Sequence, residues 1–285
     1  MLKSRLSCPH SHFDGTCNPD NPQHWFKKFL DSDADIYCQA YTIDDNPTLP
    51  PEFVADLKKE YAGTVYYNRF ILGQWAAANG IIYRPFADSI AAGDGRFLWP
   101  ADKPCTPWRV FIGVDFGGNG SKHAFVATGI LPLYSSIVGL ASARVEPKDQ
   151  NADFLADQLI DFCMAVFARY GEIHYIFCDS AEQTLINHIR SRLRVCPLGW
   201  LADRVQNSAK IPIIDRIRLT SILMGGGRFH YMPEAATLRD ALAAALWSQK
   251  HPGLDERLDD GTTDIDTLDA FEYTIERFAR ELTRR

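Results

Sequence analysis

From residue 109 onward, short apolar segments typical of strands are followed by amphipathic segments typical of helices, in an order that few folds accommodate. Residues 109–115, 123–131 and 135–145 have the composition of strands, and hairpin connections would join the second and third to the first. Helix-like and strand-like segments then alternate. The predicted elements that follow are helix 152–169, strand 173–178, helix 181–192, strand 197–202, helix 213–224, strand 228–231, helix 233–248 and, after a polar loop at 249–263, a final helix.

This order indicates an α/β fold. Three strands in a meander, followed by alternating helices and strands, are typical of an RNase H-like (RuvC-type) mixed sheet flanked by helices. Residues 1–100 are instead rich in Pro, Asn, Asp and aromatic side chains, with helix-like pieces at 23–31 and 51–60, so an irregular N-terminal segment is expected. Pro100, Pro104 and Pro107 mark its boundary with a second domain at 101–285.

Three aspartates stand where such a sheet would bring them together. Asp115 ends the first apolar strand, Asp179 follows the strand at 173–178, and Asp269 lies in the last helix, one turn after Asp266. Parallel strands would place Asp115 and Asp179 at their shared carboxyl edge, where open α/β sheets bind ligands. Carboxylate oxygens suit Mg²⁺ or Mn²⁺, and two such ions can hold the attacking and leaving oxygens of a phosphodiester. We therefore predict Asp115, Asp179 and Asp269 as catalytic metal ligands, with Asp266 either a further ligand or a solvated residue.

Each aspartate also has an ordinary structural interpretation. An Asp at the end of a strand is often a turn former or a helix cap, and capping alone would be the better interpretation of Asp179 taken by itself. Asp269 alone would be a polar residue on an amphipathic helix. Asp115 is harder to explain in this way, because it ends an almost wholly apolar strand. The order of the three favours the functional interpretation.

Basic residues near these motifs are candidates for DNA contact. Lys122 and His123 begin the second strand. Lys210 and Arg204 lie between the second and third acidic motifs, where Arg216 and Arg218 could extend them to a basic rim. The alternatives are a charged hairpin end for the first pair and solvated surface cations for the others.

Composition sets wider limits on the class of protein. The chain has 285 residues, 46% of them hydrophobic, and a net charge of −6, which argues against a general nucleic-acid coat but not against a nuclease. No apolar run is long enough to span a bilayer and no signal peptide is apparent, so a cytoplasmic location is expected. The scattered cysteines predict reduced thiols. A zinc site at Cys8, His10, His12 and Cys17 matches no standard spacing.

Several motifs together resemble the large subunit of tailed-phage terminases, the DNA-packaging motor, over nearly the whole chain. Residues 15–19, followed by 24–26, are similar to the coupling segment near the end of the terminase ATPase domain. Residues 45–49, 61–63, 69–75 and 80–83 are similar to the stretch that links ATPase and nuclease. Residues 112–115, 178–180 and 268–273 are similar to the three acidic motifs of the C-terminal nuclease.

The resemblance implies an endonuclease that cleaves double-stranded phage or prophage DNA during packaging, with Mg²⁺ or Mn²⁺ as cofactor. It also implies the small terminase subunit and the portal protein as partners. The phosphate-binding loop of such motors is absent from the sequence, since residues 117–122 have the wrong spacing, so ATPase activity is not expected.

Two other functions compete with this interpretation. An actin-like or sugar-kinase-like phosphotransferase shares the core fold, opens with an Asp-x-Gly-Gly type of turn, and could use residues 225–227 as adenosine-binding glycines. Such enzymes carry two copies of the core, however, and this chain has room for one. The other alternative is an inactive prophage remnant, against which the presence of all three acidic positions argues.

Overall fold

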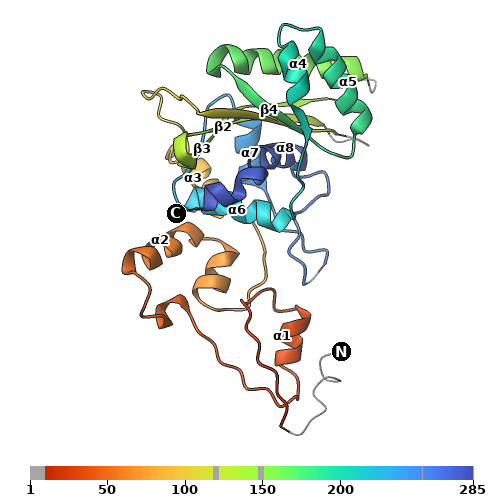
Figure 1. Ribbon diagram of the computed structural model, residues 1–285. Coiled ribbons are helices and arrows are strands. Elements are labelled where there is room, and N and C mark those ends of the chain that lie inside the picture. Colours follow the sequence, from red (N-terminus) through yellow and green to blue (C-terminus); the bar gives the residue numbers. More distant parts are fainter. Residues whose placement is uncertain (1–9, 118–121, 147–150, 252, 285) are drawn as a thin grey trace.

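In the computed structural model of the protein, residues 10–117, 122–146, 151–251 and 253–284 are described. They form one six-stranded sheet with the strand order β5-β4-β1-β2-β3-β6 (Figure 1). The strands are β1 (Arg109–Asp115), β2 (His123–Ile130), β3 (Ile137–Val145), β4 (Ile173–Cys178), β5 (Val205–Asn207) and β6 (Phe229–Tyr231).

The sheet is mixed. The meander β1, β2 and β3 is antiparallel, whereas β4 runs parallel to β1, β5 parallel to β4, and β6 parallel to β3. Three antiparallel strands continued by two parallel ones are the RNase H-like arrangement, and the predicted fold class is confirmed. The carboxyl ends of β1, β4 and β5 consequently lie at one edge of the sheet.

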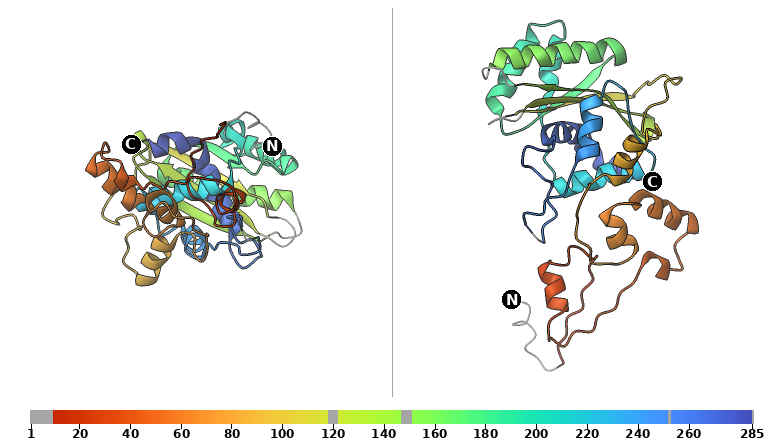
Figure 2. Two further views of the ribbon diagram at one scale, coloured as in Figure 1. Left: turned by 90° about the horizontal axis from the view of Figure 1, so that it is seen from below. Right: turned by 180° about the vertical axis from the view of Figure 1, so that it is seen from behind.

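Helices cover both faces of the sheet (Figures 1 and 2). One face carries α4 (Ala152–Tyr170) and α5 (Gln183–Arg194), and the other carries α6 (Ile213–Gly225), α7 (Ala236–Ala244) and α8 (Ile265–Ile275). Side chains alternate along a strand, so Val110, Ile112 and Val114 of β1 pack in the layer with α4 and α5, while Phe111 packs in the opposite layer. The almost continuous apolar composition of β1 reflects this burial on both faces.

The N-terminal part of the chain extends away from the sheet before it returns to it (Figure 1). It contains α1 (Trp25–Leu30), α2 (Pro51–Tyr61), a π-helical turn at Tyr67–Ile71 and α3 (Arg84–Ala92). Residues from Tyr61 to Phe97 contribute side chains to the same apolar layer as α6, α7 and α8. Buried Arg69 ties this region to the loop before α8 through an ion pair with Asp255. The segment that we expect to be irregular thus includes a well-packed portion.

Three elements differ from the prediction. The strand expected at 197–202 is wrong: Gly199–Arg204 is a 3-10 helix and the strand follows it, because the buried Leu198, Leu201 and Ala202 recur at helical spacing. Helix α3 is not among the predicted elements, although Pro85 stands in its first turn, where proline is favoured. Helix α7 ends at Ala244, because the next residues form isolated bridges to Ile81 and Arg257.

In the part of the chain that the structure describes, no helix is both long and apolar enough to cross a membrane.

Candidate active site

The carboxyl edge of the sheet brings Asp115 and Asp179 together. Asp115 is the last residue of β1, and Asp179 directly follows β4. Val114 pairs with Cys178 in the parallel ladder, and the backbone N–H of Asp179 donates a hydrogen bond to the carbonyl oxygen of Val114 at 2.9 Å. The two aspartates therefore stand side by side at the ends of neighbouring strands, as the strand order predicts.

Helix α8 brings Asp269 and Asp266 to the same edge. Alternation along β1 turns Asp115 toward α8, on the same side as Gly113. A β-carbon on Gly113 would lie 1.7 Å from the carbonyl oxygen of Ala270, so only glycine allows the helix to lie this close to the strand. The negative charges of Asp269, Asp179 and Asp266 all act on Asp115, with that of Asp269 the strongest.

Asp115 is the most strongly perturbed of these carboxyl groups. Its side chain is almost completely buried, and this burial, reinforced by the three neighbouring carboxylates, raises its pKa to about 8. The hydroxyl of Tyr273 donates a hydrogen bond to Asp115 Oδ1 at 3.1 Å, and this bond lowers the pKa of Asp115 and so partly opposes the effect of burial. Without a nearby cation Asp115 is therefore mostly protonated at neutral pH, and a cation would favour its ionised form.

Lys210 neutralises Asp179. Its ammonium group forms an ion pair with Asp179 Oδ1, the same oxygen that accepts a hydrogen bond from the backbone N–H of Ala181 at 3.0 Å. Lys210 lies in the loop after β5, the third strand whose carboxyl end faces this edge. Asp179 does not act as the cap of α5, because that helix begins four residues later, at Gln183.

Two arginines neutralise Asp269. Arg216 of α6 approaches Asp269 Oδ1 at 3.2 Å, and Arg257 binds the same oxygen. Both guanidinium groups also contact the fully buried Glu272, at 3.1 and 2.8 Å. Arg216 is only 5% exposed, so it is an internal residue of the site and not the surface cation that the sequence suggested.

The chemistry of these donors fits a hard divalent cation, although the side chains do not surround one. Among the described residues, no three His, Cys, Asp or Glu side chains are arranged to hold a metal ion together. Asp179 and Asp269 are instead engaged by Lys210, Arg216 and Arg257, which supply the positive charge that the acidic edge requires. The acidic edge offers only oxygen donors, as a Mg²⁺ or Mn²⁺ site requires. It also contains a buried carboxyl group, that of Asp115, whose ionised form a cation would stabilise.

The other predicted DNA contacts lie in different surroundings. The backbone N–H of Lys122 donates to Asp266 at 3.0 Å, while its ammonium group pairs with Glu146. His123 is buried, which lowers the pKa of its ring, and its Nδ1 accepts a hydrogen bond from the backbone N–H of Gly117 at 3.1 Å. Lys122 thus borders the acidic edge, whereas His123 binds the backbone of Gly117 just after β1.

Arg204 is not part of this group. It precedes β5 and binds Glu172 at 2.6 Å and the carbonyl oxygen of Ile173 at 2.9 Å. Ile173 begins β4, so Arg204 lies at the edge of the sheet opposite to Asp179.

The sequence predictions did not include the residues that hold the aspartates in place, which are Tyr273, Glu272 and Arg257. Tyr273 and Glu272 follow Asp269 by four and three positions, so helical spacing on the acidic motif would have found them. Arg257 gave no such signal, because it comes from the polar loop and reaches the site through an isolated bridge with Trp247.

Other sequence motifs have structural roles. Gly225, in the glycine run that resembled an adenosine site, ends α6 against α2: a β-carbon there would lie 2.0 Å from the carbonyl oxygen of Glu60. Of the cysteine and histidine cluster near the N-terminus, Cys8 is outside the described residues, and His10, His12 and Cys17 are exposed. Most of the glycine-rich turn after Asp115, at 118–121, is also outside them.

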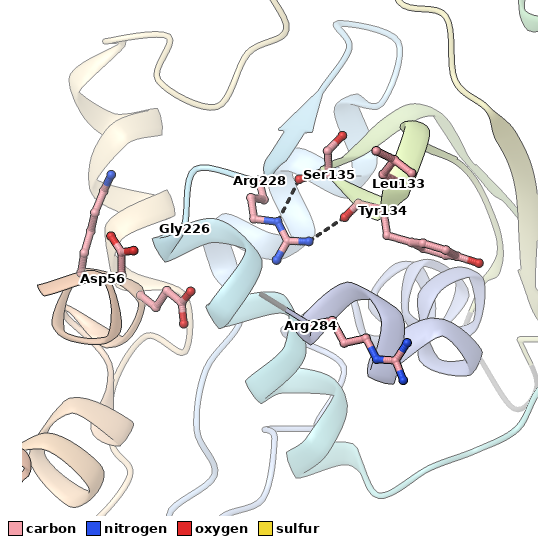
Figure 3. A pocket seen from close by; sticks show the side chains of 9 residues that line it. Asp56, Leu133, Tyr134, Ser135, Gly226, Arg228 and Arg284 are labelled. Carbon is pink, nitrogen blue, oxygen red and sulfur yellow. Dashed lines mark hydrogen bonds between the residues drawn. The ribbon is translucent and has the colours of Figure 1, made fainter. Parts of the chain in front are cut away.

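Figure 3 shows a surface pocket, whose volume is about 390 Å³. Arg228 holds it together by donating hydrogen bonds to the carbonyl oxygens of Ser135 and Tyr134, at 2.8 and 2.6 Å. These residues connect β2 to β3 next to Ile130, which pairs with Arg109 at the amino end of β1. The whole length of β1 therefore separates the pocket from Asp115, and none of the predicted site residues lines it.

Comparison with solved structures identifies a shared fold. The structure of a large terminase from a thermophilic bacteriophage matches with a TM-score of 0.75 and 20% sequence identity, covering 97% of this chain and 64% of that chain. The same phage protein in complex with ADP matches with a TM-score of 0.74 and 21% identity, covering 96% of this chain and 65% of that one. No protein-family model matches the chain, and no curated protein does. The chain thus has the fold of about two thirds of a phage large terminase.

Proposed function

We propose that this chain is the nuclease part of a phage or prophage large terminase, a metal-dependent endonuclease that cleaves double-stranded DNA during genome packaging. The observation that carries the proposal is the convergence of Asp115, Asp179 and Asp269 from β1, β4 and α8 at one edge of an RNase H-like sheet. Residues 101–285 would form the nuclease domain, and residues 1–100 the end of the ATPase domain and the linker.

In this proposal Asp115, Asp179 and Asp269 hold Mg²⁺ or Mn²⁺, with Asp266 completing the set of ligands. Two such ions, when bound, would polarise the scissile phosphate and favour the ionised form of the attacking water. Only oxygen ligands are required, which agrees with the composition of the acidic edge.

The other residues of the chain would position these ligands. Tyr273 donates to Asp115 Oδ1 and orients that carboxylate. Arg257 and Arg216, fixed by the buried Glu272, hold one oxygen of Asp269 and leave the other available. Asp115 would give up its proton when the cation binds, because the cation stabilises the ionised form that burial and the neighbouring carboxylates disfavour.

The reaction is the hydrolysis of a phosphodiester. Water adds to the phosphorus atom, one P–O ester bond breaks, and the departing oxygen takes a proton, which leaves a hydroxyl group on one end and a phosphate monoester on the other. Lys122 and Lys210 border the acidic edge and would contact the DNA backbone there. His123 would act through its hydrogen bond with Gly117 just after Asp115, and Arg204 would meet DNA only farther along the sheet.

The partners follow from the same proposal. Double-stranded DNA is the substrate, and the small terminase subunit and the portal protein would recruit the enzyme. The matching terminase of the thermophilic phage was solved with ADP bound. ATP hydrolysis is not part of the proposal for this chain, because its sequence lacks the phosphate-binding loop.

A nicking assay on supercoiled plasmid tests the proposal. Purified protein should relax and linearise the plasmid in Mn²⁺, EDTA should stop the reaction, and Asp115→Asn should lower the rate by at least about 10²-fold because it deletes a ligand charge. Asp203→Asn is the matched control, since this aspartate is exposed and far from the acidic edge. Cleavage by Asp115→Asn at the wild-type rate would rule out the assigned site, and a wild-type protein without cleavage would favour an inactive remnant.

A further inference from the structure

We propose that Glu276 is a positioning residue of this site, because it fixes the loop after β5 that carries Lys210. In the metal-free protein Lys210 forms an ion pair with Asp179, and once metal has bound its ammonium group turns to the DNA phosphate. This inference rests on the proposed nuclease function.

The loop that carries Lys210 is built onto the acidic edge. It follows β5, whose neighbour β4 leads into Asp179. The backbone N–H of Ser208 donates to the carbonyl oxygen of Cys178 at 2.7 Å, which continues the ladder by one bond and brings the loop alongside Asp179. The ion pair between Lys210 and Asp179 closes this arrangement.

Glu276 holds the loop with its carboxylate. Its side chain is buried, and it accepts hydrogen bonds from three successive backbone N–H groups, those of Ala209, Lys210 and Ile211, at 2.6, 3.0 and 3.1 Å. Lys210 has a φ of 51°, which lies in the left-handed region. This conformation is energetically unfavourable for a residue other than glycine. Charge-assisted bonds to three consecutive donors compensate for this cost and specify the conformation.

The same helical segment carries Glu276 and the third metal-ligand candidate. Glu276 begins the short helix that directly follows α8, two turns after Asp269. Arg277 adds a further bond, from its guanidinium group to the carbonyl oxygen of Asn207 at 2.6 Å. These hydrogen bonds therefore fix the backbone of the Lys210 loop to the helical segment that carries Asp269, while the side chain of Lys210 can still turn.

Lys210 and a metal ion compete for Asp179. The Lys210 side chain is 40% exposed and that of Asp179 only 16%, so the lysine, and not the aspartate, is free to move away. An ammonium group displaced by metal remains within one side-chain length of the edge, where a phosphate bound to that metal would lie. One residue thus serves as an internal counter-ion without metal and as a phosphate ligand with it.

Opposite changes in metal binding and cleavage are the signature of this arrangement. Lys210→Met keeps the length of the side chain and removes its charge, so Mn²⁺ measured by calorimetry without DNA should bind roughly two- to fivefold more tightly. Cleavage at saturating Mn²⁺ should fall roughly tenfold, because a charged contact to the phosphate is lost. Glu276→Gln should change both quantities in the same directions, and adding it to Lys210→Met should change cleavage little further.

Purely structural damage gives a different result, because it weakens metal binding and cleavage together. Glu234→Gln is the control, as it removes a surface ion pair with Arg169. If Glu276→Gln does not fold, Glu276→Asp, which keeps the charge and shortens its reach, makes the same comparison. Unchanged or weaker Mn²⁺ binding in Lys210→Met overturns the inference, even if the wild-type protein cleaves DNA. A wild-type protein that binds Mn²⁺ but cleaves nothing contradicts the nuclease function and leaves the metal competition to be decided by calorimetry.

Discussion

Gly113 lies directly against the carbonyl oxygen of Ala270, so that a β-carbon on the glycine would come within 1.7 Å of that oxygen. This contact sets how close α8 approaches β1. Asp269 is next to Ala270 and Asp115 is two residues after Gly113, so the same contact sets the distance between two of the proposed metal ligands.

Gly113→Ala should therefore disable the site from a position that bears no functional group. The added methyl group must push α8 away from β1, at a cost of roughly 1–3 kcal/mol in the free energy of unfolding, and Mn²⁺ binding should weaken. Calorimetry on the folded variant measures the second effect. Gly226→Ala is the control, since its β-carbon would meet nothing nearer than 3.2 Å. A Gly113→Ala protein that binds Mn²⁺ as well as the wild type would show that the helix spacing does not matter.

The stability of the metal-free protein should depend on the protonation of Asp115. Its pKa in the folded protein, about 8, lies above the ordinary value of 3.8, so between these values the folded state binds more protons than the unfolded chain. The contribution of this group to stability is full below pH 4 and is lost as the pH rises through 8.

Asp115→Asn removes this dependence. In EDTA at pH 8 the variant should melt several degrees above the wild type. Each kcal/mol gained in the free energy of unfolding should raise the melting temperature by roughly 2–4 °C. The difference between the two proteins should shrink toward pH 5. Melting temperatures from pH 5 to pH 9 give the comparison, with Asp203→Asn as the exposed control. A variant that is less stable than the wild type throughout this range would contradict the burial of an uncompensated carboxylate.

Arg257 should be far more important to stability than a surface arginine. It is 6% exposed and binds both the partly buried Asp269 and the fully buried Glu272. Arg257→Met leaves these two carboxylates with Arg216 as their remaining partner, at a cost of roughly 3–5 kcal/mol. Arg169→Met, which breaks an exposed pair with Glu234, should cost less than about 1 kcal/mol. Chemical denaturation of the two variants measures both values, and equal losses would argue against the buried network.

The sequence predicts the sheet well because its strands are apolar and its helices are amphipathic. The bounds of β1 and β4 agree with the prediction, and their parallel pairing places Asp115 and Asp179 as expected. The predicted position of β5 is wrong, since a three-residue strand carries little pattern of its own and is specified by its pairing with β4.

The counter-ions of the site could not be predicted in the same way. Arg257 comes from a loop, Arg216 looked like a surface residue on α6, and the loop with Lys210 is held by a glutamate 66 positions later in the chain. Such contacts depend on how the helices pack against the sheet. Local periodicity does not encode this packing.

A crystal of the protein soaked in Mn²⁺, with anomalous diffraction recorded at the manganese edge, tests the central claim most directly. We expect one or two manganese ions between Asp115, Asp179 and Asp269, roughly 3.5–4 Å apart if both are present, with the ammonium group of Lys210 withdrawn from Asp179. Anomalous density elsewhere on the molecule, with Asp179 still bound to Lys210 and Asp269 still bound to Arg216 and Arg257 at a saturating concentration of Mn²⁺, would contradict the assignment of a metal-dependent nuclease site.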